Sequence, residues 1–334
     1  MRTLKLDGGG QARLVEAPEP VPSLGEVVIR TRLSALCGSE LHGYRGQGMT
    51  AGNSGHEGMG IVQAVGPGVS RVKLGQRVGV SAIAGCGRPE CAACRQGQST
   101  WCPDRRFYGS MHAEAFLTAE TACLPLPEDV SDPVGVLLSG DGLGVPYHSS
   151  RKIAGEDVRT VAVFGLGPIG LGHVLLQAHL GRRVIGIDRV PQRLQLAAQL
   201  GAVQTVDACK LDPIAAIVGL TGGRGVDVAI EAAGVPATVQ QCFGAVRTAG
   251  TVVLNGEQGP VELSPSEDFI RRDVRAVGSW FYHVGEFPEM LRLYREGLPA
   301  ARLVTHVLPF EEAPQAFALF ASGQTGKVML QHGV

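Results

Sequence analysis

Short apolar runs separated by turn residues fill the first third of the chain. Segments 26–30, 60–65 and 78–80 are rich in valine and isoleucine, and glycine and proline residues interrupt the chain between them. Many short strands with Gly and Pro turns are typical of barrel-like β domains. Between residues 85 and 110, polar residues and cysteines replace the apolar runs. A loop of this length needs another source of order, so we predict a β domain with one separately stabilised loop.

Apolar strands and helical patterns alternate from about residue 158 onwards. We predict strands at 161–164, 184–187, 226–230 and 251–254, and helices at 169–180 and 191–200 that end at Gly181 and Gly201. Such alternation favours a parallel sheet with helices on both faces. The tail carries predicted helices at 287–295 and 311–320 and predicted strands at 303–308 and 327–330. The pattern therefore predicts an α/β protein, but it assigns the tail to neither part.

Composition narrows the function classes. The 334 residues suffice for two domains, and 44% hydrophobic with 18% charged residues are ordinary values for a globular protein. A net charge of -1 gives no electrostatic reason to expect nucleic acid or an anionic membrane as a partner. No apolar run is long enough for a membrane-spanning helix, and residues 1–7 lack the apolar run of a signal peptide. We expect a cytoplasmic protein.

A glycine-rich turn joins the first predicted strand of the alternating part to the helix that follows it. Gly165 permits a tight turn, Gly167 lets the backbone approach a pyrophosphate, and Gly170 lets helix and strand pack closely. The helix N-terminus supplies unpaired N–H groups. Asp188 ends the next strand, where its carboxylate can accept hydrogen bonds from ribose hydroxyls and repel a 2′-phosphate. These positions favour NAD over NADP, although Arg189 weakens that preference; the alternative is a simple glycine-rich turn.

Four cysteines gather in the loop between residues 85 and 110: Cys86, Cys91, Cys94 and Cys102. Their thiolates are close enough in sequence to surround one zinc ion, and such a closed tetrahedron stabilises a fold instead of catalysing. The alternative is a redox pair formed by Cys91 and Cys94, which leaves the other two cysteines unexplained. We predict a structural zinc site. We expect the isolated cysteines to be packing residues: Cys123, Cys209 and Cys242.

A second set of metal-binding residue types is dispersed along the chain. Cys37 and His56 are ligands that zinc accepts, and a catalytic zinc needs three protein ligands and one exchangeable position. Asp141, in a glycine-rich stretch ahead of the dinucleotide-binding part, is the third ligand that we select. Each residue also has a plain explanation, His56 as a satisfied histidine and Asp141 as a turn or cap residue. The residues taken singly leave both explanations open.

The order of these motifs resembles that of the zinc-dependent alcohol dehydrogenases of the medium-chain dehydrogenase/reductase superfamily. The zinc signature of that family matches the stretch from Gly55-His56-Glu57 through Gly60 and Gly66 to Val69, and segment 37–42 is similar to its first-ligand segment. The resemblance covers essentially the whole chain. It implies a GroES-like β-barrel catalytic domain at 1–150 with 286–334. It also implies a Rossmann NAD-binding domain, with a doubly wound parallel sheet, at 151–285.

The same resemblance implies a role for each site residue. Cys37, His56 and Asp141 would surround the catalytic zinc, Glu57 would stand behind the metal or enter its shell, and Ser39 and His42 would relay a proton. Cofactor contacts would fall on the glycine-rich turn and on strand ends: Gly165, Gly167, Pro168, Ile169, Gly170, Asp188, Arg193, Asn255 and Gly256.

The implied enzyme holds one catalytic and one structural zinc per chain. It transfers a hydride between a secondary alcohol or polyol and NAD, with NADP less favoured. The chain length and the acidic third ligand resemble the polyol and threonine dehydrogenase branches. The alternatives are an NADH-dependent aldehyde or ketone reductase and, from another class, a non-catalytic NAD-binding structural relative. The family also implies a small-molecule alcohol or carbonyl substrate and a homodimer or homotetramer, with neither nucleic acid nor a membrane as partner.

Three departures from the family pattern are specific to this chain. The first gap of the cysteine loop has four residues instead of two. Glu40 stands where an aspartate normally orients the zinc-bound histidine. Its carboxylate can also accept the N–H of His56, but its extra methylene can alter the position of that ring. Segment 109–114 lacks the usual Gly-Gly-Tyr pattern near the substrate cleft. Separately, the aromatic residues at 280–282 either line a pocket or pack at an interface.

Overall fold

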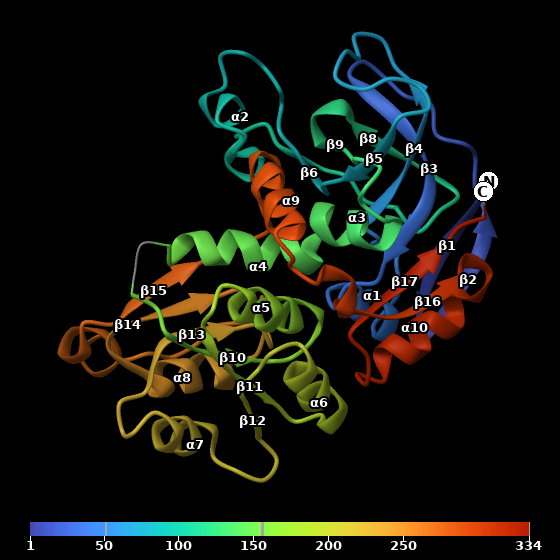
Figure 1. Cartoon of the computed structure of the whole chain (residues 1–334). Coiled ribbons are helices and arrows are strands. Elements are labelled where there is room, and N and C mark those ends of the chain that lie inside the picture. The colour runs from blue at the N-terminus through green and yellow to red at the C-terminus, as the bar shows by residue number, and fades with distance from the viewer. Residues whose placement is uncertain (51, 155–156, 334) are drawn as a thin grey trace. The chain divides into compact units, whose positions relative to one another are not determined.

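The chain divides into two compact units (Figure 1). The computed structural model describes residues 1–50, 52–154 and 157–333. The first unit comprises Met1–Gly144 and Phe281–Val334, and the second comprises Val145–Trp280. None of the helices in the described part of the chain has the length and apolar character needed to cross a lipid bilayer.

The first unit is built on a seven-stranded sheet. The strands lie in the order β16 (Val304–Pro309), β17 (Lys327–Gln331), β3 (Glu26–Ala35), β4 (Gly58–Val65), β5 (Arg77–Val80) and β9 (Cys123–Pro125), and β8 (Ala115–Ala119) also pairs with β3. Two smaller ladders join β1 (Arg2–Gly8) to β2 (Gln11–Glu16) and β6 (Ile83–Ala84) to β7 (Arg106–Phe107). Because β17 pairs antiparallel with β3, the C-terminal tail belongs to the same unit as the N-terminal segment.

Two apolar cores and a few helices complete this unit. One core lies around β3, β4 and β5 and includes Val27, Ile29 and Phe116, whereas the other includes Leu4 and Phe317. The helices are α1 (Glu40–Arg45), α2 (Ala92–Arg95), α3 (Asp132–Ser139), α9 (Phe287–Arg295), α10 (Ala313–Ala321) and the start of α4 (Asp141–Lys152). Residues from distant parts of the sequence therefore share each core.

The second unit is a parallel six-stranded sheet covered by helices on both faces (Figure 1). Its order is β12 (Gln204–Asp207), β11 (Arg183–Asp188), β10 (Thr160–Phe164), β13 (Val226–Glu231), β14 (Val246–Leu254) and β15 (Arg275–Gly278). One helix pair is α5 (Pro168–His179) with α6 (Pro191–Gln199), and the other is α7 (Pro213–Leu220) with α8 (Pro236–Ala245). All four helices begin at a proline, which has no N–H to leave unsatisfied there. From β10 the chain adds β11 and β12 on one side of the sheet and then β13, β14 and β15 on the other, so the strand order reverses beside β10. Parallel sheets with helices on both faces bind ligands at such a reversal.

The structure confirms the predicted α/β class and its alternating second part. The glycine-rich stretch around Asp141 contains the end of α3 and the start of α4, so Asp141 lies in the first turn of a helix. The glycines of this stretch let neighbouring side chains approach the backbone closely. A Cβ on Gly142 would lie 2.8 Å from the side chain of Leu137, and one on Gly144 would lie 2.3 Å from the ring of Tyr282.

Candidate metal centre and cofactor site

Four side chains with metal-binding atoms meet inside the first unit: Cys37, His56, Glu57 and Asp141. All four are buried, and one ligand atom from each lies within 4.8 Å of the others. The sheet explains how the first three meet. β3 and β4 are antiparallel neighbours with Ser34 opposite Gly58, so Cys37 just after β3 comes close to the residues just before β4. Asp141 reaches the same place from the first turn of α4.

The geometry of this cluster fits a divalent metal ion. Nε2 of His56 lies 3.2 Å from Oδ2 of Asp141, and two ligands bound tetrahedrally at about 2.0–2.1 Å lie about 3.3 Å apart. Nδ1 of His56 lies 2.8 Å from the carbonyl oxygen of Ser54. This bond orients the ring and leaves Nε2 for a metal, which is the usual arrangement of a metal-binding histidine.

The charges of the cluster favour a cation. Burial opposes a charge on His56, but the Cys37 thiol and the Asp141 carboxylate raise the pKa of His56 well above its ordinary value. A metal ion would replace the proton on His56, because metal ligands bind in their deprotonated forms. The residues present therefore fit a zinc ion with a thiolate, an imidazole and a carboxylate as ligands.

Glu57 has a buried partner that the sequence analysis missed. Nζ of Lys327 on β17 forms an ion pair with Oε1 of Glu57, and both side chains are almost completely inaccessible to solvent. The N–H of Gly142 donates to the other carboxylate oxygen at 3.3 Å. Burial raises the pKa of Glu57, and the charge of Lys327 opposes that rise. A lysine at the start of an otherwise apolar strand was the available signal for Lys327.

Glu40 does not have the partner that the resemblance implies. The N–H of His56 goes to Ser54, and the Glu40 carboxylate instead accepts the main-chain N–H of Cys37 at 2.7 Å. Its other oxygen lies 2.9 Å from Nε2 of His112. Burial opposes the charge of Glu40, but the imidazole of His112 more than offsets it, so the pKa of Glu40 lies below its ordinary value. No local pattern predicted this pair, and its histidine lies in segment 109–114, which departs from the family pattern.

The four cysteines of the loop also come together. The sulfur atoms of Cys86 and Cys94 are 3.7 Å apart, and those of Cys91 and Cys102 are 3.9 Å apart. A tetrahedron with metal–sulfur bonds of about 2.3 Å has edges of about 3.8 Å. All eight cysteines of the chain are free thiols, so no disulfide accounts for this spacing. The cluster fits a closed zinc site.

Two of the isolated cysteines are buried as expected. Cys123 and Cys242 lie within apolar cores, where burial raises the pKa of each thiol. Cys209 is exposed, so the prediction of a packing residue is wrong there. It follows β12, and its position after the strand end accounts for the exposure.

The glycine-rich turn in the second unit has the geometry of a phosphate site. Gly165 has φ +88°, and a Cβ there would lie 2.6 Å from the backbone of Ala233. A Cβ on Gly170 would lie 1.8 Å from the oxygen of Gly165, whereas one on Gly167 would meet no atom within 4 Å. Gly167 is also the N-cap of α5 and has no side chain to cap it. The open side of the turn and the free N–H groups of the helix suit a pyrophosphate.

Asp188 ends β11, close to this turn. Its carboxylate accepts the N–H groups of Leu166 and Arg189, each at 2.7 Å, and of Val190 at 2.9 Å. A carboxylate has about four acceptor positions, so capacity remains for a ribose hydroxyl. Nη1 of Arg193 lies 3.8 Å from Asp188, and the buried Nε of Arg193 has no hydrogen-bond partner among the described residues. Both observations fit a bound dinucleotide.

The side chain of Asn255 forms its hydrogen bonds with other residues of the second unit. Its oxygen accepts from Ser149 at 3.0 Å and lies 2.9 Å from Nε2 of His173, and its NH₂ group donates to Ser279 at 2.8 Å. Burial lowers the pKa of His173 to about 4, so this histidine is neutral. The N–H groups of Asn255 and Gly256 both donate to the carbonyl of Glu231, at 3.0 and 3.1 Å. The side-chain amide of Asn255 and the N–H groups of both residues are therefore already paired within the protein.

Other predicted site residues lie at the surface or against the metal cluster. Ser39 and His42 are exposed at α1. The ring of Phe281 lies 6.1 Å from that of His56 and 6.2 Å from that of Phe107. Tyr282 is buried, and its hydroxyl donates to the carbonyl of Ser139. Phe281 thus lies beside the metal cluster and Tyr282 packs inside the first unit, and the pocket and interface roles of this segment both stay predictions.

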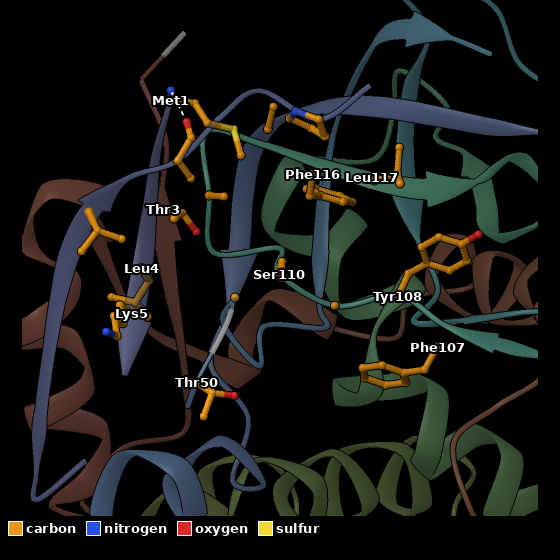
Figure 2. A pocket seen from close by; sticks show the side chains of 17 residues that line it. Met1, Thr3, Leu4, Lys5, Thr50, Phe107, Tyr108, Ser110, Phe116 and Leu117 are labelled. Carbon is orange, nitrogen blue, oxygen red and sulfur yellow. Dashed lines mark hydrogen bonds between the residues drawn. The ribbon is translucent and has the colours of Figure 1, made fainter. Parts of the chain in front are cut away.

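A separate cavity of about 450 Å³ lies in the first unit (Figure 2). Figure 2 shows side chains from β1, from the segment Phe107 to Ser110 and from β8 around it. None of the four clustered metal ligands is among the described residues that line it. Phe107 connects the two places, because its ring lines the cavity and lies 6.1 Å from the ring of His56.

Two family models and many relatives match this chain. A model described as an alcohol dehydrogenase GroES-like domain matches residues 23–128, and one described as a zinc-binding dehydrogenase matches residues 168–296. The chain is 33% identical to the L-threonine 3-dehydrogenase of Symbiobacterium thermophilum, with 99% of this chain and 97% of the relative covered. The chain belongs to the zinc-dependent alcohol dehydrogenases. It is also 29% identical to the sorbitol dehydrogenase of Bacillus subtilis, with 93% and 92% covered.

A solved structure supports the same assignment for the fold of this alcohol dehydrogenase. The alcohol dehydrogenase rspB of Escherichia coli CFT073, complexed with NADH, is 26% identical and superimposes with a TM-score of 0.87 over 99% of both chains. The comparisons confirm the predicted GroES-like and Rossmann folds and the predicted class, an oxidoreductase acting on CH–OH donors of small molecules. The family model described as a zinc-binding dehydrogenase and the two clusters of metal-binding side chains support zinc as a cofactor, and the Escherichia coli structure holds NADH.

Proposed function

We propose that this alcohol dehydrogenase oxidises a secondary alcohol or polyol with NAD as acceptor, at a zinc site formed by Cys37, His56 and Asp141. The observation that carries the proposal is the burial of a thiol, an imidazole and a carboxylate with ligand atoms within 4.8 Å of one another. Burying three such groups together is costly unless a cation pairs with them. The relatives named for threonine and sorbitol support the substrate class, because both compounds carry secondary hydroxyl groups.

The surrounding residues keep the site open and oriented. Zinc bound there would act as a Lewis acid on the substrate oxygen. Lys327 holds the carboxylate of Glu57, which leaves three protein ligands and one position for substrate. The rings of Phe107 and Phe281 each lie 6.1 Å from the ring of His56, so an apolar aromatic border adjoins the site. We assign proton exchange with solvent to Ser39 and His42, and their exposure supports that role.

The second unit supports NAD as the acceptor. Asp188 keeps acceptor capacity for a ribose hydroxyl, and its negative charge disfavours a 2′-phosphate. The unpartnered Nε of Arg193 offers a donor beside it. We assign the pyrophosphate to the backbone of the turn from Gly165 to Gly170, with Pro168 and Ile169 at the start of α5.

The test is a comparison of Cys37→Ala with Cys123→Ala. Both replace a buried thiol of the first unit, but only Cys37 belongs to the metal cluster. Cys37→Ala should lose one metal ion per chain and its activity while NAD affinity stays unchanged, and Cys123→Ala should retain all three. Rates with NAD and with NADP, measured in both directions on secondary alcohols, polyols and amino alcohols, define the substrate class. Full activity in metal-free Cys37→Ala would disprove the proposal.

Three further predictions accompany this proposal. We take the two compact units as the catalytic and the NAD-binding domains, with the tail in the former. The homodimer or homotetramer stays a prediction, and so does the cytoplasmic location.

A further inference from the structure

A chain of buried hydrogen bonds begins at the main-chain N–H of Cys37. Oε2 of Glu40 accepts the main-chain N–H of Cys37 at 2.7 Å, and Oε1 lies 2.9 Å from Nε2 of His112. The side chains of Glu40 and His112 are both fully inaccessible to solvent. Because an ionised carboxylate can only accept hydrogen bonds, Nε2 of His112 must be the donor.

The ring of His112 is held at its second nitrogen as well. Nδ1 lies 2.8 Å from Oγ of Ser34, which in turn lies 3.1 Å from Nε2 of His332. His332 is stacked on Phe310 with ring centroids 4.2 Å apart. Contacts at both nitrogens fix the plane of the His112 ring, so its N–H points at Glu40 in one defined direction.

The backbone of His112 is tied to the other metal-binding segment. Oδ1 of Asn53 accepts the N–H groups of His112 and Gly55, both at 3.1 Å, and Nδ2 of Asn53 donates to the carbonyl of His112 at 3.0 Å. The N–H of Met111 donates to the carbonyl of Gly55 at 3.0 Å. Gly55 directly precedes His56, so the segment around His112 contacts both chain segments that carry metal ligands.

We propose that His112 is a positioning residue of the metal centre: through Glu40 it fixes the main chain of Cys37, and through Asn53 it fixes the segment before His56. This inference rests on the proposed function, since it takes Cys37 and His56 as metal ligands. The physical reason is the burial of Glu40. A buried carboxylate that loses one of its two donors is no longer held in place, and a shift of the Glu40 carboxylate disturbs its hydrogen bond to Cys37. Partners of this kind typically change metal affinity by about 10- to 100-fold when they are lost.

Two substitutions at His112 separate the bridge from simple packing. In His112→Gln, the amide N–H groups reach about as far as Nε2, so a donor to Glu40 is kept. The shorter side chain in His112→Asn places its amide near Ser34 and leaves Glu40 with only the main-chain N–H of Cys37 as a donor. His332→Gln serves as a control for the far end of the same hydrogen-bond chain, because His332 is also buried and contacts Ser34 instead of Glu40.

The readout is cobalt binding to the metal-depleted protein, measured against a competing chelator, together with the cobalt–thiolate absorption band. The spectrum of Cys37→Ala defines the contribution of the four-cysteine site. His112→Asn should weaken cobalt binding at the Cys37 site by about 10- to 100-fold and shift its band, whereas His112→Gln and His332→Gln should stay within about threefold of wild type.

A second variant keeps the test decisive if His112→Asn does not fold. Glu40→Asp keeps the charge but is one methylene too short to span Cys37 and His112, so it should weaken cobalt binding to a similar extent. Wild-type cobalt affinity and spectrum in either folded variant would overturn the inference. Failure of the proposed function would look different: the wild-type protein would bind cobalt at Cys37 normally and still oxidise no alcohol.

Discussion

The ion pair between Lys327 and Glu57 provides the sharpest test of the buried charges around the metal centre. Lys327 retains 2% and Glu57 0% of their side-chain exposure. Replacing Lys327 by methionine preserves most of the buried volume and removes the charge. Among the described residues, the N–H of Gly142 at 3.3 Å would then be the one hydrogen-bond donor left to the Glu57 carboxylate. A buried negative charge would remain almost unpaired.

Two estimates of the cost agree. Removing one partner of a buried ion pair costs about 3–5 kcal/mol, because the other charge stays buried. Alternatively, Glu57 can take up a proton and stay buried without a charge. At about pH 7.5, protonating a glutamate whose pKa is ordinary in the unfolded chain costs about 4 kcal/mol. We therefore expect Lys327→Met to lower the free energy of unfolding by about 3–4 kcal/mol. The double variant Lys327→Met with Glu57→Gln should recover most of this loss, because it buries no charge.

The loss should also depend on pH with a defined sign. Burial already raises the pKa of Glu57 in the folded protein, and Lys327 opposes the rise. Without Lys327 the pKa rises further, so the folded state binds a proton more tightly than the unfolded state does. The variant therefore becomes less stable relative to wild type as pH rises above the ordinary pKa of glutamate, and the difference shrinks at lower pH.

Urea unfolding followed by the fluorescence of Trp101 gives the required free energies. The chain has two tryptophans, and Trp280 belongs to the second unit, so a Trp280→Phe background lets the first unit report alone. Three results would refute the reasoning: a loss below about 1 kcal/mol, a loss independent of pH, or an equal loss in the double variant.

Two further predictions concern the second unit. Asp188→Asn removes the negative charge beside the ribose site, so the ratio of kcat/KM with NAD to kcat/KM with NADP should fall by about tenfold or more; an unchanged ratio would show that Asp188 does not set the preference. Burial opposes the charge of Asp227, but its ion pair with Arg247 and its bonds to Thr160 and Arg159 hold its pKa at about 2. Its contribution to stability is complete above the ordinary value of 3.8 and is lost as pH falls through about 2. Asp227→Asn should remove at most about 2 kcal/mol of acid-sensitive stability, and unchanged acid unfolding by circular dichroism would contradict this.

Local pattern was enough to predict much of the fold. The strands and helices of the second unit follow from alternation of apolar segments and from glycine at helix ends, because each element there is decided by residues close in sequence. The predicted strand at 26–30 is shorter than β3, which extends to Ala35. It does so because β17 pairs with its far end, and a contact between such distant segments leaves no local trace.

The candidate site shows the same limit. Its ligands belong to residue types that bind zinc, so they were visible in the sequence. The residues that hold them were not: Lys327 lies 270 positions from Glu57, and His112 lies 72 positions from Glu40. The resemblance implies that Glu40 orients His56, but Ser54 is nearer to the N–H of His56 and His112 takes the carboxylate. Partners that are chosen by tertiary packing cannot be assigned from spacing.

Zinc content combined with X-ray absorption at the zinc edge tests the central claim most directly. The account predicts about two zinc ions per chain, one with four sulfur ligands and one with a single sulfur and two nitrogen or oxygen ligands from the protein. In Cys37→Ala the second signal should disappear while the first remains. A single zinc with only sulfur ligands in the wild-type protein would show that Cys37, His56 and Asp141 do not form a metal centre.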